Sequence, residues 1–427
     1  MTLDVEARLA DYLDRIERHN GALNVYLDVR AESAKREAAA SAARHAKGET
    51  LSAIDGAMIA VKANIAVEGL PWHAGIAAYK DQIAEQDAQT VARLKAAGAI
   101  ILGSVNMEEG ALGAVTDNPH FGKTYNPWGD AFTPGGSSGG SGAAVAAQLC
   151  DGALGSDTMG STRVPASYCG ICGHKPSRGR VPFDGVMPLS TSLDHVGPMA
   201  QSASMLALLD AILADTNPAQ PIELSGVTIG RWRFEDHVQI DGEVQASFET
   251  ALDQLKRAGA RIIDITLPRY EFSRSRRDGL IISEIEGFGI HKDALARDPA
   301  GFSDTFRALL EYGSRVKPER AETAYRVLET SAMDAADVFE RCDLLVSPTT
   351  LETAFAFGEP VPATQADLTA FADFAGIPAT AVPSGLTGSG LPASIQFMAA
   401  RGRDEVSLGA AMAFEAVRGA FALPELK

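Results

Sequence analysis

Apolar and polar side chains follow two different periods along this chain. Residues 9–16 place apolar side chains at positions i, i+3, i+4 and i+7, which predicts a helix with one buried face. Residues 58–61 instead form a short apolar run, which predicts a buried strand that leads directly to Lys62. The same two patterns recur to the end of the chain.

The other helical patterns and apolar runs predict further helices and strands. Helices are expected over 31–46, 90–97, 206–214, 242–258, most of 281–339, and 405–417. Strands are expected over 99–102, 227–232, 261–265, 344–348 and 394–398. Because helices alternate with apolar strands, we expect an α/β protein in which helices cover a sheet. No internal repeat or long linker interrupts the pattern, so we expect one domain over residues 1–427.

The charge of the chain narrows the set of partners. Lys and Arg total 38 against 55 Asp and Glu, which gives a formal net charge of −17. Such a surface repels polyanions, so we expect no nucleic-acid contact. The N-terminus has no basic and apolar leader, and no apolar run is long enough to span a bilayer. We therefore expect a cytoplasmic protein that does not bind a membrane.

Cysteine and histidine give no sign of a disulfide framework or a metal site. The chain has four cysteines, too few for a disulfide scaffold of this length. Cys169 and Cys172 form a C-x-x-C pair, but no second pair supplies the further ligands that zinc needs. The eight histidines show no metal-binding spacing either. We expect no metal, and a structural role in the core for both cysteines.

The Gly/Ser segment at 135–142 is the first candidate for chemistry. It reads Gly-Gly-Ser-Ser-Gly-Gly-Ser-Gly and precedes an apolar, helix-forming run at 143–147. A flexible linker has this composition, but glycines before a helix also let the backbone approach a ligand. The segment matches the G-x-S-x-G elbow, with Ser137 or Ser138 as the nucleophile. An α/β-hydrolase esterase is therefore an alternative, although no HGGG-type oxyanion segment precedes the serine.

A second serine segment covers 155–161. It reads Gly-Ser-Asp-Thr-Met-Gly-Ser and is loop-like, because such residues favour turns. A nucleophile for acyl transfer needs backbone N–H groups aimed at the developing oxyanion, and a tight loop that runs into a helix supplies them. Ser161, the last residue of the segment, stands where a helix can begin. Taken alone, the segment is equally an ordinary turn.

Lys62 is the third candidate. A lysine after a strand is usually a solvated surface residue, but a neutral lysine can activate a serine. The ordinary lysine pKa is about 10.4, so burial has to lower it toward neutrality. The apolar flank at 59–61 is consistent with such burial.

Taken together, these segments resemble the amidase signature family, whose members hydrolyse amides with a Ser–cis-Ser–Lys triad. The segments that carry the resemblance are 60–64, 134–141, 155–161, 163–166 and 169–176. The resemblance implies the amidase-signature fold, a mixed, largely parallel central β-sheet covered by helices on both faces. It also implies a catalytic core over about 55–200 and a more variable, substrate-side region over about 215–350.

The resemblance assigns a role to each candidate. It implies Ser161 as the nucleophile, Ser137 as the serine that relays its proton, and Lys62 as the base. It implies a cis bond between Gly136 and Ser137. The oxyanion hole is expected from the main-chain N–H groups of Thr158, Met159, Gly160 and Ser161, and support for the triad from Gly136, Ser138 and Asp157. No cofactor is implied.

Three positions depart from the family pattern. Ala63 stands where an acid is frequent, Met159 where glycine is usual in the oxyanion loop, and His174 where leucine is common. Met159 bears on the mechanism, because a side chain at that position can narrow the acyl pocket.

Several functions are compatible with the resemblance. The first is an amidase that hydrolyses a small-molecule amide, with a homodimer allowed. The alternatives are a glutaminase-type subunit of a tRNA-dependent amidotransferase, which works only with partner chains, and a carbamate or ureido hydrolase. A catalytically dead binding protein is a further alternative, which the complete triad opposes.

Overall fold

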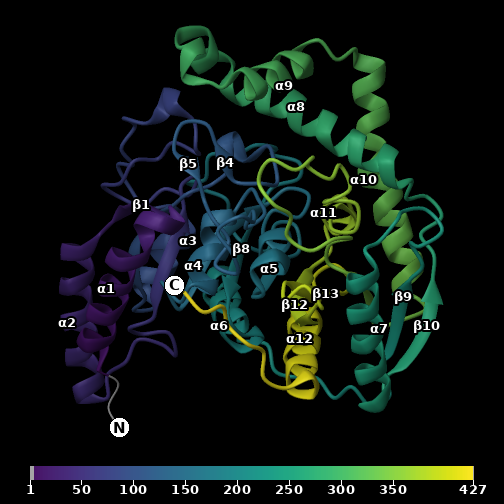
Figure 1. The fold of residues 1–427 in the computed structure, drawn as a ribbon, viewed down its shortest axis with the longest axis horizontal. Coiled ribbons are helices and arrows are strands. Elements are labelled where there is room, and N and C mark those ends of the chain that lie inside the picture. Colours follow the sequence, from purple (N-terminus) through teal and green to yellow (C-terminus); the bar gives the residue numbers. More distant parts are fainter. Residues whose placement is uncertain (1–3, 427) are drawn as a thin grey trace.

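An eleven-stranded sheet runs through the centre of the protein (Figure 1). The computed structural model describes residues 4–426. Across the sheet the strands follow the order β1-β3-β2-β6-β8-β7-β12-β13-β11-β9-β10. Their bounds are β1 Tyr26–Val29, β2 Met58–Lys62, β3 Ile100–Val105, β6 Gly152–Asp157, β7 Cys172–Lys175, β8 His195–Ala200, β9 Thr228–Trp232, β10 Arg261–Ile265, β11 Leu344–Pro348, β12 Ala379–Leu386 and β13 Pro392–Met398. A separate short hairpin pairs β4 (Asp117–Asn118) with β5 (Gly122–Lys123).

Parallel and antiparallel pairs share the large sheet. Strand β2 pairs in parallel with β3 and β6, and β9 pairs in parallel with β10 and β11. Between these groups, β8, β7, β12 and β13 pair antiparallel with their neighbours, and β1 pairs antiparallel at the edge. The expected mixed sheet is confirmed, and its parallel part is confined to the two groups around β2 and β9.

The helices pack around this sheet. Their bounds are α1 Val5–Leu23, α2 Ala31–Lys47, α3 Gln89–Ala96, α4 Gly139–Ala146, α5 Arg163–Cys169, α6 Ala203–Ala214, α7 Gly242–Arg257, α8 Phe272–Arg297, α9 Asp304–Ser314, α10 Pro318–Phe339, α11 Ala370–Ala375 and α12 Asp404–Arg418. Short 3-10 turns are η1 Ala77–Tyr79, η2 Glu109–Ala111 and η3 Pro299–Gly301. None of the helices within residues 4–426 has the length and apolar character that a membrane span requires.

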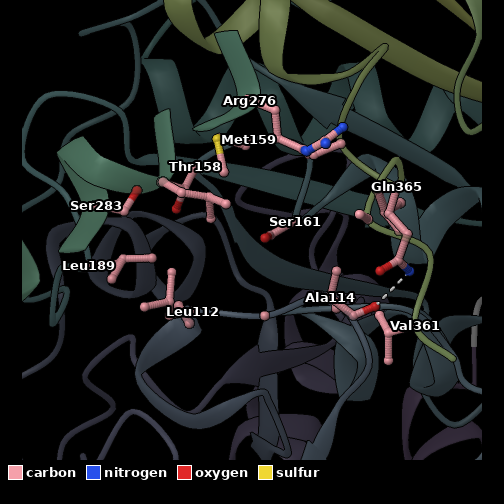
Figure 2. A pocket seen from close by; sticks show the side chains of 18 of the residues that line it. Leu112, Ala114, Thr158, Met159, Ser161, Leu189, Arg276, Ser283, Val361 and Gln365 are labelled. Carbon is pink, nitrogen blue, oxygen red and sulfur yellow. Dashed lines mark hydrogen bonds between the residues drawn. The ribbon is translucent and has the colours of Figure 1, made fainter. Parts of the chain in front are cut away.

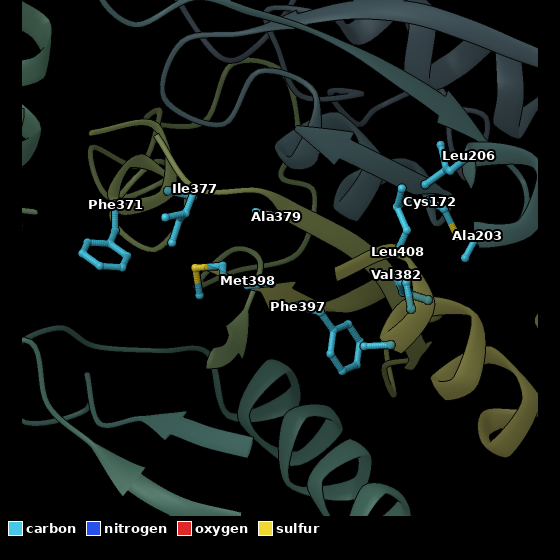
Figure 3. Close-up of a cluster of buried hydrophobic side chains, with 14 of the residues drawn as sticks. Cys172, Ala203, Leu206, Phe371, Ile377, Ala379, Val382, Phe397, Met398 and Leu408 are labelled. Atoms are coloured by element: carbon cyan, nitrogen blue, oxygen red, sulfur yellow. The ribbon is translucent and has the colours of Figure 1, made fainter. Parts of the chain in front are cut away.

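Strand β2 shows how the two faces of the sheet are covered. Ile59 and Val61 join one core cluster, whereas Met58 and Ala60 join another, as the alternation of side chains along a strand requires. Helices α3, α6, α7 and α12 contribute to the first cluster, and α1, α2, α4 and α5 to the second. Figure 3 shows part of the first cluster, in which apolar side chains of β13 and α12 lie together. Helices on both faces are therefore confirmed.

The hydrophobic pattern predicts most of these elements but misses several central strands. Each predicted helix and strand is present, most with ends shifted by a few residues, although α8 already begins at Phe272 and α1 extends to Leu23. Strands β6, β7, β8 and β12 are missed, as are β1 at the edge of the sheet and the two short hairpin strands β4 and β5. Strand β6 reads Gly-Ala-Leu-Gly-Ser-Asp and has few β-formers, yet all of its residues are buried. The expectation that 155–161 is a loop throughout is wrong, because residues 155–157 form the end of β6.

Helices α8 and α9 lie together at the top of Figure 1, and α10 runs from them toward the sheet. Helix α8 also packs against α11. Gly279 of α8 makes this approach close, since a Cβ atom at this position would lie 2.5 Å from Met159 Sδ and from the Phe374 ring. Helix α8 therefore borders the loop that carries the predicted nucleophile.

Candidate active site

Lys62 is buried at the end of β2, and its side chain joins two serines. Lys62 is 0% exposed. Its Nζ atom lies 2.7 Å from Ser137 Oγ and 2.8 Å from Ser156 Oγ, both within hydrogen-bonding distance. The Gly136–Ser137 peptide bond is cis, as the resemblance implies. The lysine and the first serine of the predicted triad are thus in direct contact.

The sheet explains why these residues meet. Strands β2 and β6 are parallel neighbours, with Val61 beside Leu154, so both strands end at the same edge of the sheet. The carboxyl ends of parallel strands are the usual place for functional side chains in α/β proteins. Lys62 ends β2, and Ser156 lies next to the end of β6. Ser137 reaches the same edge from the turn that precedes α4.

Burial sets the protonation of Lys62. It lowers the pKa of the Lys62 ammonium from its ordinary value to about 7, and the negative charges of Asp194, Asp157 and Glu108 oppose this shift only in part. A substantial fraction of Lys62 is therefore a neutral amine near neutral pH. A neutral amine has a lone pair and can accept a proton from a serine hydroxyl.

Ser161 lies in the loop between β6 and α5, next to the Lys62–Ser137 pair. The Ser138 N–H group donates a 3.2 Å hydrogen bond to the Ser161 carbonyl, which holds the two serine segments together. Ser138 also joins its segment to β6, because its hydroxyl donates to the Ser156 carbonyl at 3.1 Å. Within residues 4–426, the Ser161 hydroxyl has no hydrogen-bond acceptor or donor. Its Oγ atom faces a cavity instead (Figure 2).

Asp157 fixes the shape of this loop. Its carboxylate accepts hydrogen bonds from the Gly160 N–H at 2.5 Å and the Thr162 N–H at 3.1 Å. It also pairs with the Arg163 guanidinium at 3.0 Å, and Arg163 pairs with Asp373 at 2.6 Å. All three charged side chains are 0% exposed. The loop is thus held by a buried ion-pair network that reaches α11.

Among the four backbone N–H groups expected in the oxyanion hole, one is already hydrogen-bonded within the loop. The Gly160 N–H is taken by Asp157, so the expectation that it serves the oxyanion hole does not fit this structure. The N–H groups of Thr158, Met159 and Ser161 donate to no acceptor in the described part of the chain, 4–426. Gly160 has φ +131°, and a Cβ atom there would lie 2.2 Å from Thr369 Oγ1. Both the positive φ and the lack of space for a Cβ atom therefore require glycine at this position.

The side chains of Thr158 and Met159 point to different neighbours. The Thr158 hydroxyl donates to Asp194 at 2.6 Å, and burial raises the pKa of this carboxyl to about 6. The Met159 carbonyl accepts a 2.7 Å hydrogen bond from Thr369. The Met159 side chain borders the cavity and lies close to Gly279 of α8. Met159, one of the departures from the family pattern, thus forms part of the cavity wall.

The cavity in front of Ser161 has a volume of about 270 Å³. Figure 2 shows Ser161 near its centre, with Met159 and Arg276 together on one side and Leu112 and Leu189 on another. The polar side chains on its wall, apart from Ser161, are those of Thr158, Arg276, Ser283 and Gln365. Arg276 is the one charged residue among those that line it. A cavity of this size accepts a small molecule.

The sequence did not identify Ser156 and Asn64 as site residues. Asn64 Nδ2 donates to Ser156 Oγ at 3.2 Å, while Lys62 approaches the same oxygen at 2.8 Å. Ser156 lies inside the motif that pointed to Ser161, but its contact with Lys62 follows from the pairing of β2 with β6. That pairing is not visible in the local sequence.

A buried group of His174, Asp210 and Asp404 has its ligand atoms within 4.8 Å of one another, close enough for a metal ion. The guanidinium of Arg180 already pairs with Asp210 at 2.8 Å, and Ser177 Oγ donates to Asp404 at 2.6 Å. Although burial alone raises it, contacts with His174 and Ser177 hold the pKa of Asp404 below its usual range. With a cation already in place, the group fits an ion-pair network better than a metal site.

The C-x-x-C cysteines lie in the core. Cys169 and Cys172 are both buried and unpaired. Burial raises the pKa of both thiols, which disfavours the thiolate that metal binding or redox exchange needs. The expected structural role of the pair agrees with this environment.

Comparison with known proteins assigns the family. A model of the amidase family matches residues 7–408, so the chain belongs to this family and is an amidase-signature enzyme, a class that acts on carbon–nitrogen bonds. The A subunit of glutamyl-tRNA(Gln) amidotransferase from Anaeromyxobacter sp. (strain K) is 34% identical over 98% of this chain and 93% of its own length.

Solved structures share the whole fold. One, described as a vestigial protein complex that reveals the evolutionary origins of an s-triazine catabolic enzyme, is 31% identical, with a TM-score of 0.89 over 100% of this chain and 97% of that chain. The A subunit of the glutamyl-tRNA(Gln) amidotransferase of Thermotoga maritima is 28% identical, with a TM-score of 0.82 over 99% of this chain and 95% of that chain.

Proposed function

We propose that this protein hydrolyses the carbon–nitrogen bond of a small amide through an acyl-enzyme on Ser161. The observation that carries the proposal is the contact between buried Lys62 and Ser137, with Ser161 on the wall of the adjoining cavity. A serine nucleophile needs a base, and a lysine with a pKa of about 7 can serve as one.

The proposed proton path uses the Lys62–Ser137 contact and the position of Ser161 beside it. Neutral Lys62 accepts the proton of Ser137 as Ser137 accepts that of Ser161, and Ser161 Oγ attacks the amide carbon. The N–H groups of Thr158, Met159 and Ser161 are available for the negative charge that develops on the carbonyl oxygen. The carbon–nitrogen bond then breaks, and the amine leaves with the proton that the relay returns. Water attacks the ester by the same path and releases the acid.

The sequence comparisons favour a more specific second candidate, a glutaminase-type subunit of an amidotransferase. The similarity to the A subunit of glutamyl-tRNA(Gln) amidotransferase extends over 98% of this chain. In this function the chain releases ammonia from glutamine, and partner chains use it on a tRNA-bound substrate. The net charge of −17 agrees with a subunit that leaves the tRNA contact to its partners.

Ammonia release from a panel of amides tests both candidates. The purified wild-type protein and the Ser161→Ala variant are assayed with glutamine, simple aliphatic amides, a carbamate and a ureido compound. Hydrolysis of simple amides that falls at least about 10³-fold in the variant supports the general proposal. Activity on glutamine alone favours the amidotransferase function. Hydrolysis that survives in Ser161→Ala contradicts the proposed acyl-enzyme.

A further inference from the structure

Arg276 is a cation on the wall of an otherwise uncharged cavity. It comes from α8, and it is the one charged side chain among the residues that line the space in front of Ser161. Its neighbours on the wall include Leu280, Leu112 and Leu189, which are apolar. An isolated cation in such surroundings is costly unless it has an anionic partner.

Asp367 supplies one such partner and also orients the guanidinium. Arg276 Nη1 donates to Asp367 Oδ1, and Asp367 is 0% exposed. The arginine itself keeps 17% of its side chain exposed. Asp367 is not among the residues that line the cavity, whereas Arg276 is. The carboxylate therefore pairs with Arg276 from outside the cavity wall.

The remaining donors of Arg276 are unused. A guanidinium has five N–H groups arranged as a planar fork, and only the Nη1 group has an acceptor among residues 4–426. A planar fork of this kind matches the two oxygens of a carboxylate. Figure 2 shows the Arg276 side chain on the same side of the cavity as Met159, with Ser161 nearer the centre. An amide held at Ser161 can thus extend its far end toward Arg276.

We infer that Arg276 selects small amides that carry a carboxylate at the end remote from the scissile bond. The inference rests on the proposed function of Ser161. It adds that the substrates carry a terminal carboxylate, are short enough for a cavity of about 270 Å³, and are bound by the Arg276 N–H groups that Asp367 does not occupy. Glutamine, succinamate and glutaramate belong to this class, whereas simple aliphatic amides do not.

A pair of matched amides tests the inference. Glutaramate and valeramide have the same chain length and differ in the terminal carboxylate. In the wild-type protein, kcat/KM should be at least about tenfold higher for glutaramate, because a charge-assisted hydrogen bond is lost with the neutral amide. In Arg276→Gln this preference should disappear, mainly through a higher KM for glutaramate. Arg276→Lys keeps the positive charge but lacks the planar pair of N–H donors, so it should retain part of the preference for glutaramate.

Arg274→Gln is the matched control. Arg274 lies on the same helix, is 61% exposed and pairs with Glu271, so its replacement should leave the glutaramate preference unchanged. An equal loss on both amides in Arg276→Gln indicates a purely structural arginine and overturns the inference. Wild-type hydrolysis of valeramide with no preference for glutaramate overturns it as well, but leaves the proposed function intact. Hydrolysis of no amide at all contradicts the proposed function instead.

Discussion

Ser156 Oγ lies 2.8 Å from Lys62 Nζ, almost as close as Ser137 Oγ at 2.7 Å. Asn64 Nδ2 donates to the same Ser156 oxygen at 3.2 Å. A neutral lysine amine has two N–H groups and one lone pair, so an N–H donated to Ser156 helps to turn the lone pair toward Ser137. Ser156 is thus a positioning residue for the base.

Replacing Ser156 with Ala should lower kcat by about 5- to 150-fold, because one hydrogen bond of a buried amine is worth about 1–3 kcal/mol. Stopped assays on a simple amide give the rate. Ser141→Ala is the control, since the Ser141 hydroxyl is also buried but donates to the Leu154 carbonyl instead. Equal rates for both variants would show that Ser156 does not position Lys62.

The activity should depend on pH through Lys62. Its pKa is lowered to about 7 by burial, and only the neutral form accepts a proton. Below this pH, kcat/KM should therefore rise about tenfold per pH unit and then level off. A profile of kcat/KM from pH 5 to 9 measures this limb. A profile that is flat through pH 7 would contradict a lysine base whose pKa is about 7.

The charge of Asp194 should affect the pH at which kcat/KM rises. Its negative charge raises the pKa of Lys62 against the effect of burial. Asp194→Asn removes the charge, so the Lys62 pKa should fall and the rising limb should move to lower pH. Asp253→Asn, at an exposed position on α7, should leave the limb in place. A rising limb that moves to higher pH in Asp194→Asn would contradict this prediction.

Arg163 should be essential for stability. Its guanidinium pairs with Asp157 and Asp373, and all three side chains are 0% exposed. Arg163→Met leaves two buried carboxylates unpaired, which should cost about 3–5 kcal/mol of unfolding free energy. Urea unfolding measures the loss. Arg326→Met, which breaks an exposed pair with Glu322, should cost less than about 1 kcal/mol. Similar losses in both variants would contradict this role of the network.

Met159 should set the size of the accepted acyl group. Its side chain lines the cavity and lies against α8. Met159→Gly should therefore favour branched acyl amides over short ones by about 1–3 kcal/mol relative to the wild-type protein. The ratio of kcat/KM for the two amides measures this. An unchanged ratio would assign Met159 to packing against α8 alone.

The triad could be predicted from the sequence because its members lie in short segments with recognisable residue order. Lys62 and Ser137 are in contact as expected, and Ser161 lies beside them. The occupied Gly160 N–H could not be predicted, since it depends on the turn that the Asp157 carboxylate makes. Arg276 could not be predicted either, because the approach of α8 to the loop, as at Gly279 and Met159, depends on tertiary packing.

The same contrast applies to the fold. Strands with apolar, β-branched runs, such as 58–62 and 344–348, follow from pattern alone. Strand β6 does not, because its glycines and serine suit a turn and only burial between β2 and β8 makes it a strand. Long-range pairing, rather than local preference, decides its structure.

Labelling with a fluorophosphonate tests the central claim, that Ser161 is the nucleophile. Peptide mass spectrometry of the labelled wild-type protein should find one adduct, on Ser161, and none in Ser161→Ala. The labelling rate should rise with pH through about 7, as Lys62 becomes neutral. An adduct on Ser137 or Ser138, with Ser161 unmodified, would contradict the account and favour an elbow-type hydrolase.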